Sequence, residues 1–285
     1  DTNAPGKRFE DINNNINGAP AAEAYFMHKA VKTNVNFHYG GVPFQLGGAN
    51  NFAADFGQGE GFVSSSFGIG SSRTENLKTP AIYVGADAPD AFLEAKIVGR
   101  SDDFTSLSDH DVQIEIEGTV YGVESYDGYE QILVNKNVDI TDLDFNNTAV
   151  TFTSLGLDGT TDVNAVSHVT LTYPRTFDFN NDKYTEFILG NNQAKYIEIS
   201  NFDAGGLPVL YDITNSWRLF PIYEDGVYKV MLPAGPGGTT QRKLIMLNVT
   251  DDCTLGNCSF PCDPDDCGLW SVPQISPINF TDYGS

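Results

Sequence analysis

The sequence predicts an all-β protein: a jelly-roll-like β-sandwich followed by a second, smaller β-rich domain or sheet extension. Period-2 alternation is clearest at Val112, Ile114 and Ile116, where every second residue is apolar, as in a strand with one buried face. The 19 Phe and 13 Tyr are typical of pleated surfaces. Short apolar runs are separated by turn-forming residues, among them 28 Gly and 14 Pro.

Four segments follow from this pattern. Residues 1–36 form an N-terminal arm, in which residues 21–32 make either one short helix or an extended stretch. Residues 37–174 hold seven or eight strands, which suits a two-sheet sandwich. Residues 175–250 form the second β-rich domain. Residues 251–285 contain a cysteine loop and then a proline-bearing stretch without periodicity, which is typical of a linker.

The region from Val169 to Thr214 predicts several short strands in succession. Apolar residues alternate within each, and we expect each set to share one face of a strand: Val169, Leu171 and Tyr173; Ile197 and Ile199; and Val209, Tyr211 and Ile213. Tyr173-Pro174-Arg175 is expected to end the first strand, because proline has no N–H for the ladder and restricts the residue before it.

The chain is strongly acidic, with 16 basic and 38 acidic residues and a formal charge of −22. Such a surface repels phosphate backbones, which argues against nucleic acid as a partner. No run of eighteen or more apolar residues is present, so the sequence predicts no membrane span. The chain begins at Asp1 without an initiator Met or a signal peptide, which suggests a processed or trimmed protein.

All the cysteines lie in one acidic loop with the spacing C-x4-C-x3-C-x4-C, at Cys253, Cys258, Cys262 and Cys267. An even, clustered set favours two local disulfides in an oxidising compartment, with three possible pairings. A structural zinc site and free thiols are the alternatives, although zinc usually takes C-x2-C pairs. The neighbouring aspartates raise a thiol's pKa, which is the wrong direction for a nucleophile, so we expect no catalytic cysteine here.

No other catalytic motif is found. The four histidines, His28, His38, His110 and His168, show no metal-ligand spacing and are expected to be ordinary surface or strand-edge residues. The chain has no G-x-S-x-G motif. Gly57, Gly59 and Gly61 lack the strand–loop–helix context of a phosphate loop and indicate a bulge or tight hairpin instead.

Two binding sites remain as candidates. Asp178, Asn180 and Asp182 form the D-x-N-x-D opening of a calcium loop, although Lys183 and Leu189 exclude an EF-hand. Calcium is therefore the one candidate cofactor, and an Asx-rich turn is the alternative. Trp217 and Tyr223, with Tyr126 and Tyr129, are candidates for a sugar-stacking surface, whereas half-buried sheet positions are the plainer interpretation.

The chain resembles a known family over residues 55–285, most closely at 168–250 and in the closing PINFTDYG. The order of VTLTYPRTFDF, KYIEISNF and PVLYDIT, with a Gly-Glu-Gly-aromatic element at Glu60, is similar to the region upstream of the peptidase domain in gingipain-type cysteine peptidases. The type IX secretion system sortase is the nearest such resemblance. The cysteine loop and residues 1–36 have no counterpart in it.

The resemblance implies a Cys–His dyad in a peptidase domain beyond Ser285, so no catalytic residue falls in this chain. It also implies a place on the outer face of the outer membrane, with the downstream peptidase domain and secretion-system outer-membrane components as partners. We therefore expect a non-catalytic β region that supports an enzyme cleaving C-terminal sorting domains from secreted cargo. The alternatives are a secreted adhesin or carbohydrate-binding module, and a structural spacer.

Overall fold

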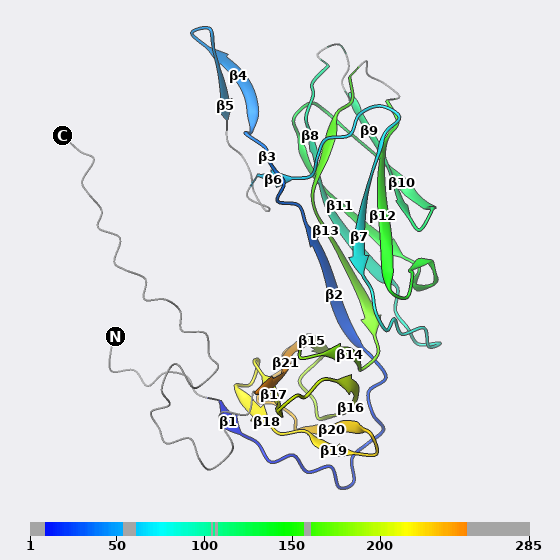
Figure 1. Cartoon of the computed structure of the whole chain (residues 1–285), viewed down its shortest axis with the longest axis vertical. Coiled ribbons are helices and arrows are strands. Elements are labelled where there is room, and N and C mark those ends of the chain that lie inside the picture. The colour runs from blue at the N-terminus through cyan, green and yellow to red at the C-terminus, as the bar shows by residue number, and fades with distance from the viewer. Residues whose placement is uncertain (1–8, 54–60, 104, 106–107, 157–160, 250–285) are drawn as a thin grey trace, which may run out of the picture. The chain divides into compact units, whose positions relative to one another are not determined.

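The computed structural model describes residues 9–53, 61–103, 105, 108–156 and 161–249, which belong to two compact units (Figure 1). We call Glu23–Asp178 the sandwich unit, and Asp1–Ala22 with Phe179–Ser285 the second unit. In the described residues the elements are strands, apart from a short 3-10 helix at Ile140–Asp142. The predicted all-β class is therefore confirmed. The described residues include no helix that is long and apolar enough to cross a membrane.

Four strands of one sheet and a second, four-stranded sheet make up the sandwich unit, and their pairs are antiparallel. The four strands of the first sheet have the order β2-β13-β8-β11, and the second sheet has the order β10-β9-β12-β7. Their bounds are β2 Phe26–Thr33, β7 Ser72–Lys78, β8 Ala91–Gly99, β9 His110–Ile116, β10 Thr119–Tyr126, β11 Gln131–Val138, β12 Asn147–Ser154 and β13 Asn164–Arg175.

The core of the sandwich unit lies between these sheets and follows the alternation in the sequence. Val112, Ile114 and Ile116 of β9 are fully buried, as predicted, and belong to the same apolar cluster as residues of β8, β12 and β13. Removing this much apolar surface from water is the main stabilising contribution to such a fold. The alternation of apolar and polar residues along each strand therefore decides which face of the strand packs into the core.

Strand β13 passes through Pro174 before it ends at Arg175. The predicted face is confirmed, because Val169, Leu171 and Tyr173 are all fully buried. The Pro174 carbonyl oxygen accepts a hydrogen bond from the Tyr83 N–H (2.8 Å), so the proline stands at the strand end with its acceptor satisfied.

Residues 26–33, in the segment for which a helix and an extended stretch were both considered, form β2. This strand pairs with β13 from Phe26 opposite Arg175 to Thr33 opposite His168. Cross-strand pairing outweighs the helix propensity of the Ala- and Lys-containing segment, as tertiary context often does. The domain limits expected after residues 36, 174 and 250 stay predictions.

Two small two-stranded sheets complete the sandwich unit. The first pairs β3 (Phe37–His38) with β6 (Phe62–Val63), and the second is a hairpin of β4 (Val42–Leu46) and β5 (Ala49–Ala53). Every residue of β4 is exposed, including Phe44 and Leu46. A two-stranded hairpin of this kind buries little apolar surface, so the sandwich core does not depend on it.

The second unit also contains two groups of strands. Their orders are β1-β18-β17-β21-β15 and β14-β16-β20-β19. The bounds are β1 Glu10–Asp11, β14 Asp178–Asp182, β15 Tyr184–Gly190, β16 Lys195–Phe202, β17 Leu207–Asp212, β18 Trp217–Leu219, β19 Ile222–Glu224, β20 Val227–Leu232 and β21 Gln241–Val249. An aromatic series, Phe187–Phe179–Phe202–Tyr228, runs through its core at ring-centroid distances of 5.5, 6.2 and 6.0 Å.

The predicted faces in the second unit are confirmed in part. Ile197 and Ile199 of β16 are fully buried, as expected. On β17 only Val209 of its predicted apolar face is buried, whereas Tyr211 is half-buried and Asp212, on the opposite face, is completely buried. Asp212 is buried because Arg242 pairs with it there, a contact that alternation alone does not reveal.

The N-terminal segment is tied to the second unit by polar contacts. The Asn14 side-chain amide donates to the carbonyl oxygens of Phe220 (3.0 Å) and Lys229 (2.9 Å), and its oxygen accepts from the Met231 N–H (2.9 Å). β1 runs parallel to β18, where Arg218 makes two hydrogen bonds to Asp11. The Asn-rich N-terminal segment therefore supplies side-chain hydrogen bonds to the second unit as well as turns.

Candidate functional site

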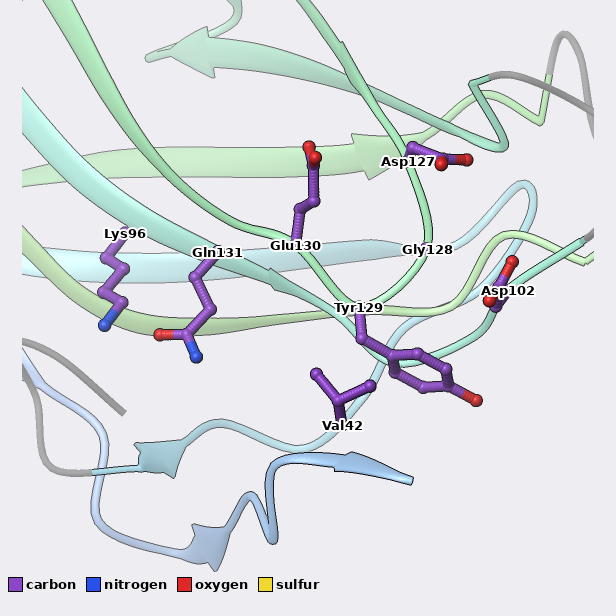
Figure 2. A pocket seen from close by; sticks show the side chains of 8 residues that line it. All are labelled: Val42, Lys96, Asp102, Asp127, Gly128, Tyr129, Glu130 and Gln131. Carbon is purple, nitrogen blue, oxygen red and sulfur yellow. The ribbon is translucent and has the colours of Figure 1, made fainter. Parts of the chain in front are cut away.

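A groove of about 800 Å³ lies at one end of the sandwich unit (Figure 2). Its lining comes from the end of β8, the β10–β11 turn and the start of β4. The residues are Val42, Lys96, Asp102, Asp127, Gly128, Tyr129, Glu130 and Gln131. A concave site with an aromatic ring and a few convergent polar groups is the usual setting of a small-ligand site.

Strand alternation places two of the polar groups on the same face of the sheet. Gln131 stands opposite Val98, and Leu133 stands opposite Lys96, so Gln131 and Lys96 are diagonal neighbours on the outward side. The Lys96 side chain is only 8% exposed, whereas Val42 across the groove is 40% exposed. Figure 2 shows Lys96, Gln131 and Tyr129 extending toward the side on which Val42 lies, while Glu130 points the other way.

The ring of Tyr129 has an apolar base. It is half-buried and packs against the small cluster formed by Tyr39, Val63, Val98 and Ala165. A tyrosine held in this way keeps one face on the protein and offers an amphipathic surface to a ligand.

The turn that carries Tyr129 is fixed at Gly128. This residue has φ +51, and a Cβ added to it would lie 3.3 Å from Asp102 Cγ. Its N–H donates to Asp109 Oδ1 (2.8 Å), and its carbonyl oxygen accepts from His110 Nε2 (2.8 Å). The turn at Gly128 is therefore held by two buried side chains, Asp109 and His110. They belong to a group of polar residues that we call the buried polar centre.

His110, at the first position of β9, occupies the middle of that centre and is completely buried. Its Nδ1 lies 2.8 Å from Asp162 Oδ1, and its Nε2 lies 2.8 Å from the Gly128 carbonyl oxygen and 3.2 Å from that of Ser101. Carbonyl and carboxylate oxygens only accept hydrogen bonds, so both ring nitrogens carry protons and the ring is an imidazolium. The expectation of an ordinary surface or strand-edge histidine is wrong for His110.

Neighbouring charges set the pKa values in this centre. Burial acts to lower the pKa of His110, but the hydrogen bond that the ring donates to Asp162 and the charge of Asp109 outweigh it, and the pKa is raised. Burial acts to raise the pKa of Asp162, but hydrogen bonds from His110, Ser154 and Asn164 outweigh it, and the pKa is lowered. The two shifts agree with a buried ion pair.

Two further groups complete the centre and its rim. The Tyr126 ring is stacked on the His110 ring, with centroids 4.6 Å apart and an interplanar angle of 16°. At the groove itself, burial first and then the charges of Asp109 and Asp127 raise the pKa of Asp102. The centre therefore positions the groove.

Of the predicted aromatics, the structure brings Tyr129 to the groove and buries Tyr126 beneath it. Trp217 and Tyr223 lie in the second unit, on β18 and β19, which belong to different sheets. Trp217 is half-buried against the guanidinium of Arg242 (5.5 Å), and Tyr223 is 64% exposed beside Tyr228. A ligand at Trp217 or Tyr223 stays a prediction.

The calcium candidates Asp178, Asn180 and Asp182 all lie on β14. Asn180 and the adjacent Asn181 have φ +50 and +61, so the backbone turns at this position, as asparagine permits. Among the described residues no group of three His, Cys, Asp or Glu side chains is arranged to hold a metal. That search does not cover asparagine or carbonyl ligands, so calcium binding stays a prediction.

Cys253, Cys258, Cys262 and Cys267 lie outside the described residues, as do Gly57, Gly59 and Glu60. The expected disulfides therefore stay predictions. The groove itself was not predicted. Two signals in the sequence point to it: Asp127-Gly128 between two alternating runs, which is typical of a hairpin turn, and a histidine flanked by Asp109 and Asp111.

No family model matches the chain, and no curated protein matches it by sequence. Among solved structures, it is similar to dimeric latent PorU from Porphyromonas gingivalis, with a TM-score of 0.54 and 8% identity. That match covers 81% of this chain and 21% of the PorU chain, so this chain spans about a fifth of its neighbour's length.

A CBM36-1 domain of a multidomain xylanase from the hindgut metagenome of Trinervitermes trinervoides matches less well. Its TM-score is 0.28 at 10% identity, covering 50% of this chain and 96% of that one. A score this low carries no argument about fold. What the comparisons show is therefore a PorU-like β fold without sequence-level family membership.

Proposed function

We propose that this chain is a non-catalytic β region of a cell-surface, gingipain-like sortase, which supports a downstream peptidase domain. The observation that carries the proposal is the PorU-like fold over 81% of the chain, because PorU is the type IX sortase. The partners would be the downstream domain and outer-membrane components of the secretion system, at the outer face of the outer membrane.

The apolar cores and the net charge of the chain are consistent with a supporting role. Each unit has its own apolar core, and the formal charge of −22 favours solubility over adsorption to anionic surfaces. In the sandwich unit, the buried His110 side chain holds loops through hydrogen bonds to Asp162, Ser101 and Gly128. A well-packed β domain of this kind can orient an attached domain without contributing to its chemistry.

Peptide cleavage by the isolated chain tests the proposal. Residues 1–285 should not cleave a fluorogenic peptide that spans the junction between a cargo protein and its C-terminal sorting domain. The longer native protein should cleave it and should lose activity with a thiol-alkylating reagent. Turnover by residues 1–285 that survives replacement of all four cysteines by alanine would overturn the assignment.

A secreted adhesin or carbohydrate-binding sandwich is the second candidate. The groove with its Tyr129 ring favours it. Binding of a glycan without any peptidase in the native protein would move this candidate to first place.

A further inference from the structure

We propose that the groove beside Tyr129 binds an oligosaccharide that is uncharged or bears amino groups, with the Tyr129 ring as its apolar platform. Gln131, Lys96 and Asp102 would hydrogen-bond the sugar hydroxyls. The site is independent of the supporting role proposed above, since a groove without glycan affinity would leave that role standing.

The first argument is the match between lining and ligand. A sugar ring presents C–H groups on its faces and hydroxyls around its edge, so it needs an aromatic surface and polar groups that both donate and accept. Tyr129 supplies the surface, the Gln131 amide donates and accepts, Lys96 donates and Asp102 accepts. Val42 adds a second apolar contact on the opposite side (Figure 2).

The second argument is preorganisation. Lys96 and Gln131 stand on paired strands, and the Gly128 peptide before Tyr129 is held by Asp109 at its N–H and by His110 at its carbonyl oxygen. Groups already fixed in place lose little conformational entropy when a ligand binds. A site for a weakly bound ligand such as a sugar depends on this small loss of conformational entropy.

The third argument is charge, which selects among ligand classes. The lining includes three carboxylates, Asp102, Asp127 and Glu130, and one amine, Lys96, and Glu130 points away from the side of the groove on which Val42 lies. None of the described residues forms an ion pair with Asp102 or Asp127. Uronic or sulfated glycans and phosphate esters would be repelled, whereas hydroxyl and ammonium groups would be accepted.

A bare cation is the alternative ligand for such carboxylates. The described residues offer no group of three His, Cys, Asp or Glu arranged for a metal, and the side of the groove nearest Val42 carries the Lys96 amine. A positive side chain beside a cation site would weaken it. The mixed lining therefore fits an uncharged polar ligand better than a metal ion.

Isothermal titration of residues 1–285 with cellohexaose, maltohexaose, mannohexaose and chitohexaose tests the proposal, with a heparin-derived hexasaccharide as the anionic control. At least one of the four should bind and the heparin fragment should not. Tyr129→Ala should weaken that binding at least about tenfold, which corresponds to about 1.4 kcal/mol. Tyr129→Phe should keep it within about threefold, because the ring face is retained.

Tyr184→Ala is the matched control, since it removes an exposed tyrosine from β15 of the second unit and should leave binding unchanged. If Tyr129→Ala unfolds, as judged by its melting curve, Gln131→Ala and Lys96→Met should show the same loss of affinity. The proposal is overturned if none of the four sugars binds at about 10 mM, which corresponds to less than about 3 kcal/mol. It is equally overturned if binding survives these groove variants or if the heparin fragment binds best.

Discussion

The His110 imidazolium and the Asp162 carboxylate form an ion pair at 2.8 Å in which both side chains are completely buried. The pair joins the first residue of β9 to the segment just before β13. Through Nε2, the same ring also holds the carbonyl oxygens of Ser101 and Gly128. One side chain thus fixes several loops at the groove end of the sandwich unit.

Removing one member of this pair should be strongly destabilising. Asp162→Asn leaves an imidazolium buried without its counter-charge, and we expect a loss of about 3–5 kcal/mol in the free energy of unfolding. Urea denaturation followed by circular dichroism measures it. His38→Asn is the control, because His38 is exposed on β3 and should cost no more than about 0.5 kcal/mol. A loss of under about 1 kcal/mol for Asp162→Asn would contradict the ion-pair description.

The pair should also give a defined pH dependence. The pKa of His110 is raised above 6.5, so its contribution to stability is fully present below pH 6.5 and is lost as the pH rises through the folded-state pKa. The pKa of Asp162 is lowered below 3.8, so its contribution is present above pH 3.8 and is lost as the pH falls further.

Melting temperatures from pH 3 to pH 9 test this, with His110→Leu compared against the unsubstituted chain. The difference in melting temperature between the two proteins should be largest between pH 3.8 and pH 6.5. It should shrink as the pH rises above 6.5. A difference that grows steadily with rising pH would mean that His110 is neutral in the folded protein.

His28 should change the stability of the protein with pH in the opposite direction to His110. Burial first, and then the charge of Arg175, lower its pKa from 6.5 to about 4. Stability is therefore lost as the pH falls from 6.5 toward 4, because the unfolded chain takes up a proton that the folded chain resists. His28→Phe keeps an aromatic ring against Phe26 and Tyr173 without the titration.

The expected result is that His28→Phe gains stability relative to the unsubstituted chain between pH 6.5 and pH 4 and differs little above pH 7. Chemical denaturation at pH 5 and pH 8 provides the comparison. Equal effects at both pH values would show that packing, and not protonation, determines the role of His28.

In the second unit, removing one member of the buried pair Arg242 and Asp212 should be as destabilising as removing one member of the His110–Asp162 pair. Arg242 Nε and Nη2 lie 2.7 and 2.5 Å from Asp212 Oδ2, and Nη1 donates to the Pro233 carbonyl oxygen (2.9 Å). Arg242→Ala should cost about 3–5 kcal/mol, because Asp212 is left buried and unpaired. The double variant Arg242→Met with Asp212→Leu should cost less than the single one.

Arg218 and Asp11 offer a matched control in the same unit, since this arginine also makes two hydrogen bonds to an aspartate but at the surface. Arg218→Ala should cost no more than about 1 kcal/mol. Unfolding followed by denaturant titration compares the two. Similar losses for Arg218→Ala and Arg242→Ala would refute the dependence on burial.

The sequence is informative wherever apolar periodicity alone decides the structure. The alternation at Val112, Ile114 and Ile116 identifies β9 and its buried face, because a period of two is the geometry of a strand. It fails at Asp212, since a buried charge depends on a partner, Arg242, that is remote in sequence. It fails at His110 for the same reason, because Asp162 and the Gly128 carbonyl come from distant segments.

The sequence signals the turn beside the groove at Asp127-Gly128, but it could not identify Tyr129 as the aromatic residue of the groove, for a related reason. Tyr129 was one of several candidate aromatics, and nothing in its neighbours distinguishes it from Tyr126. The strand register then buries Tyr126 at 4% exposure and places Tyr129 in the groove. Which of two nearby tyrosines meets solvent depends on pairing, which local sequence does not determine.

The mass of the native protein tests the central claim most directly. An antibody raised against residues 1–285 should capture a species far larger than 31 kDa, and its peptides should continue past Ser285 into a domain with a catalytic cysteine and histidine. A captured species of 31 kDa, with no peptides beyond Ser285, would contradict the account and leave a stand-alone β module in its place.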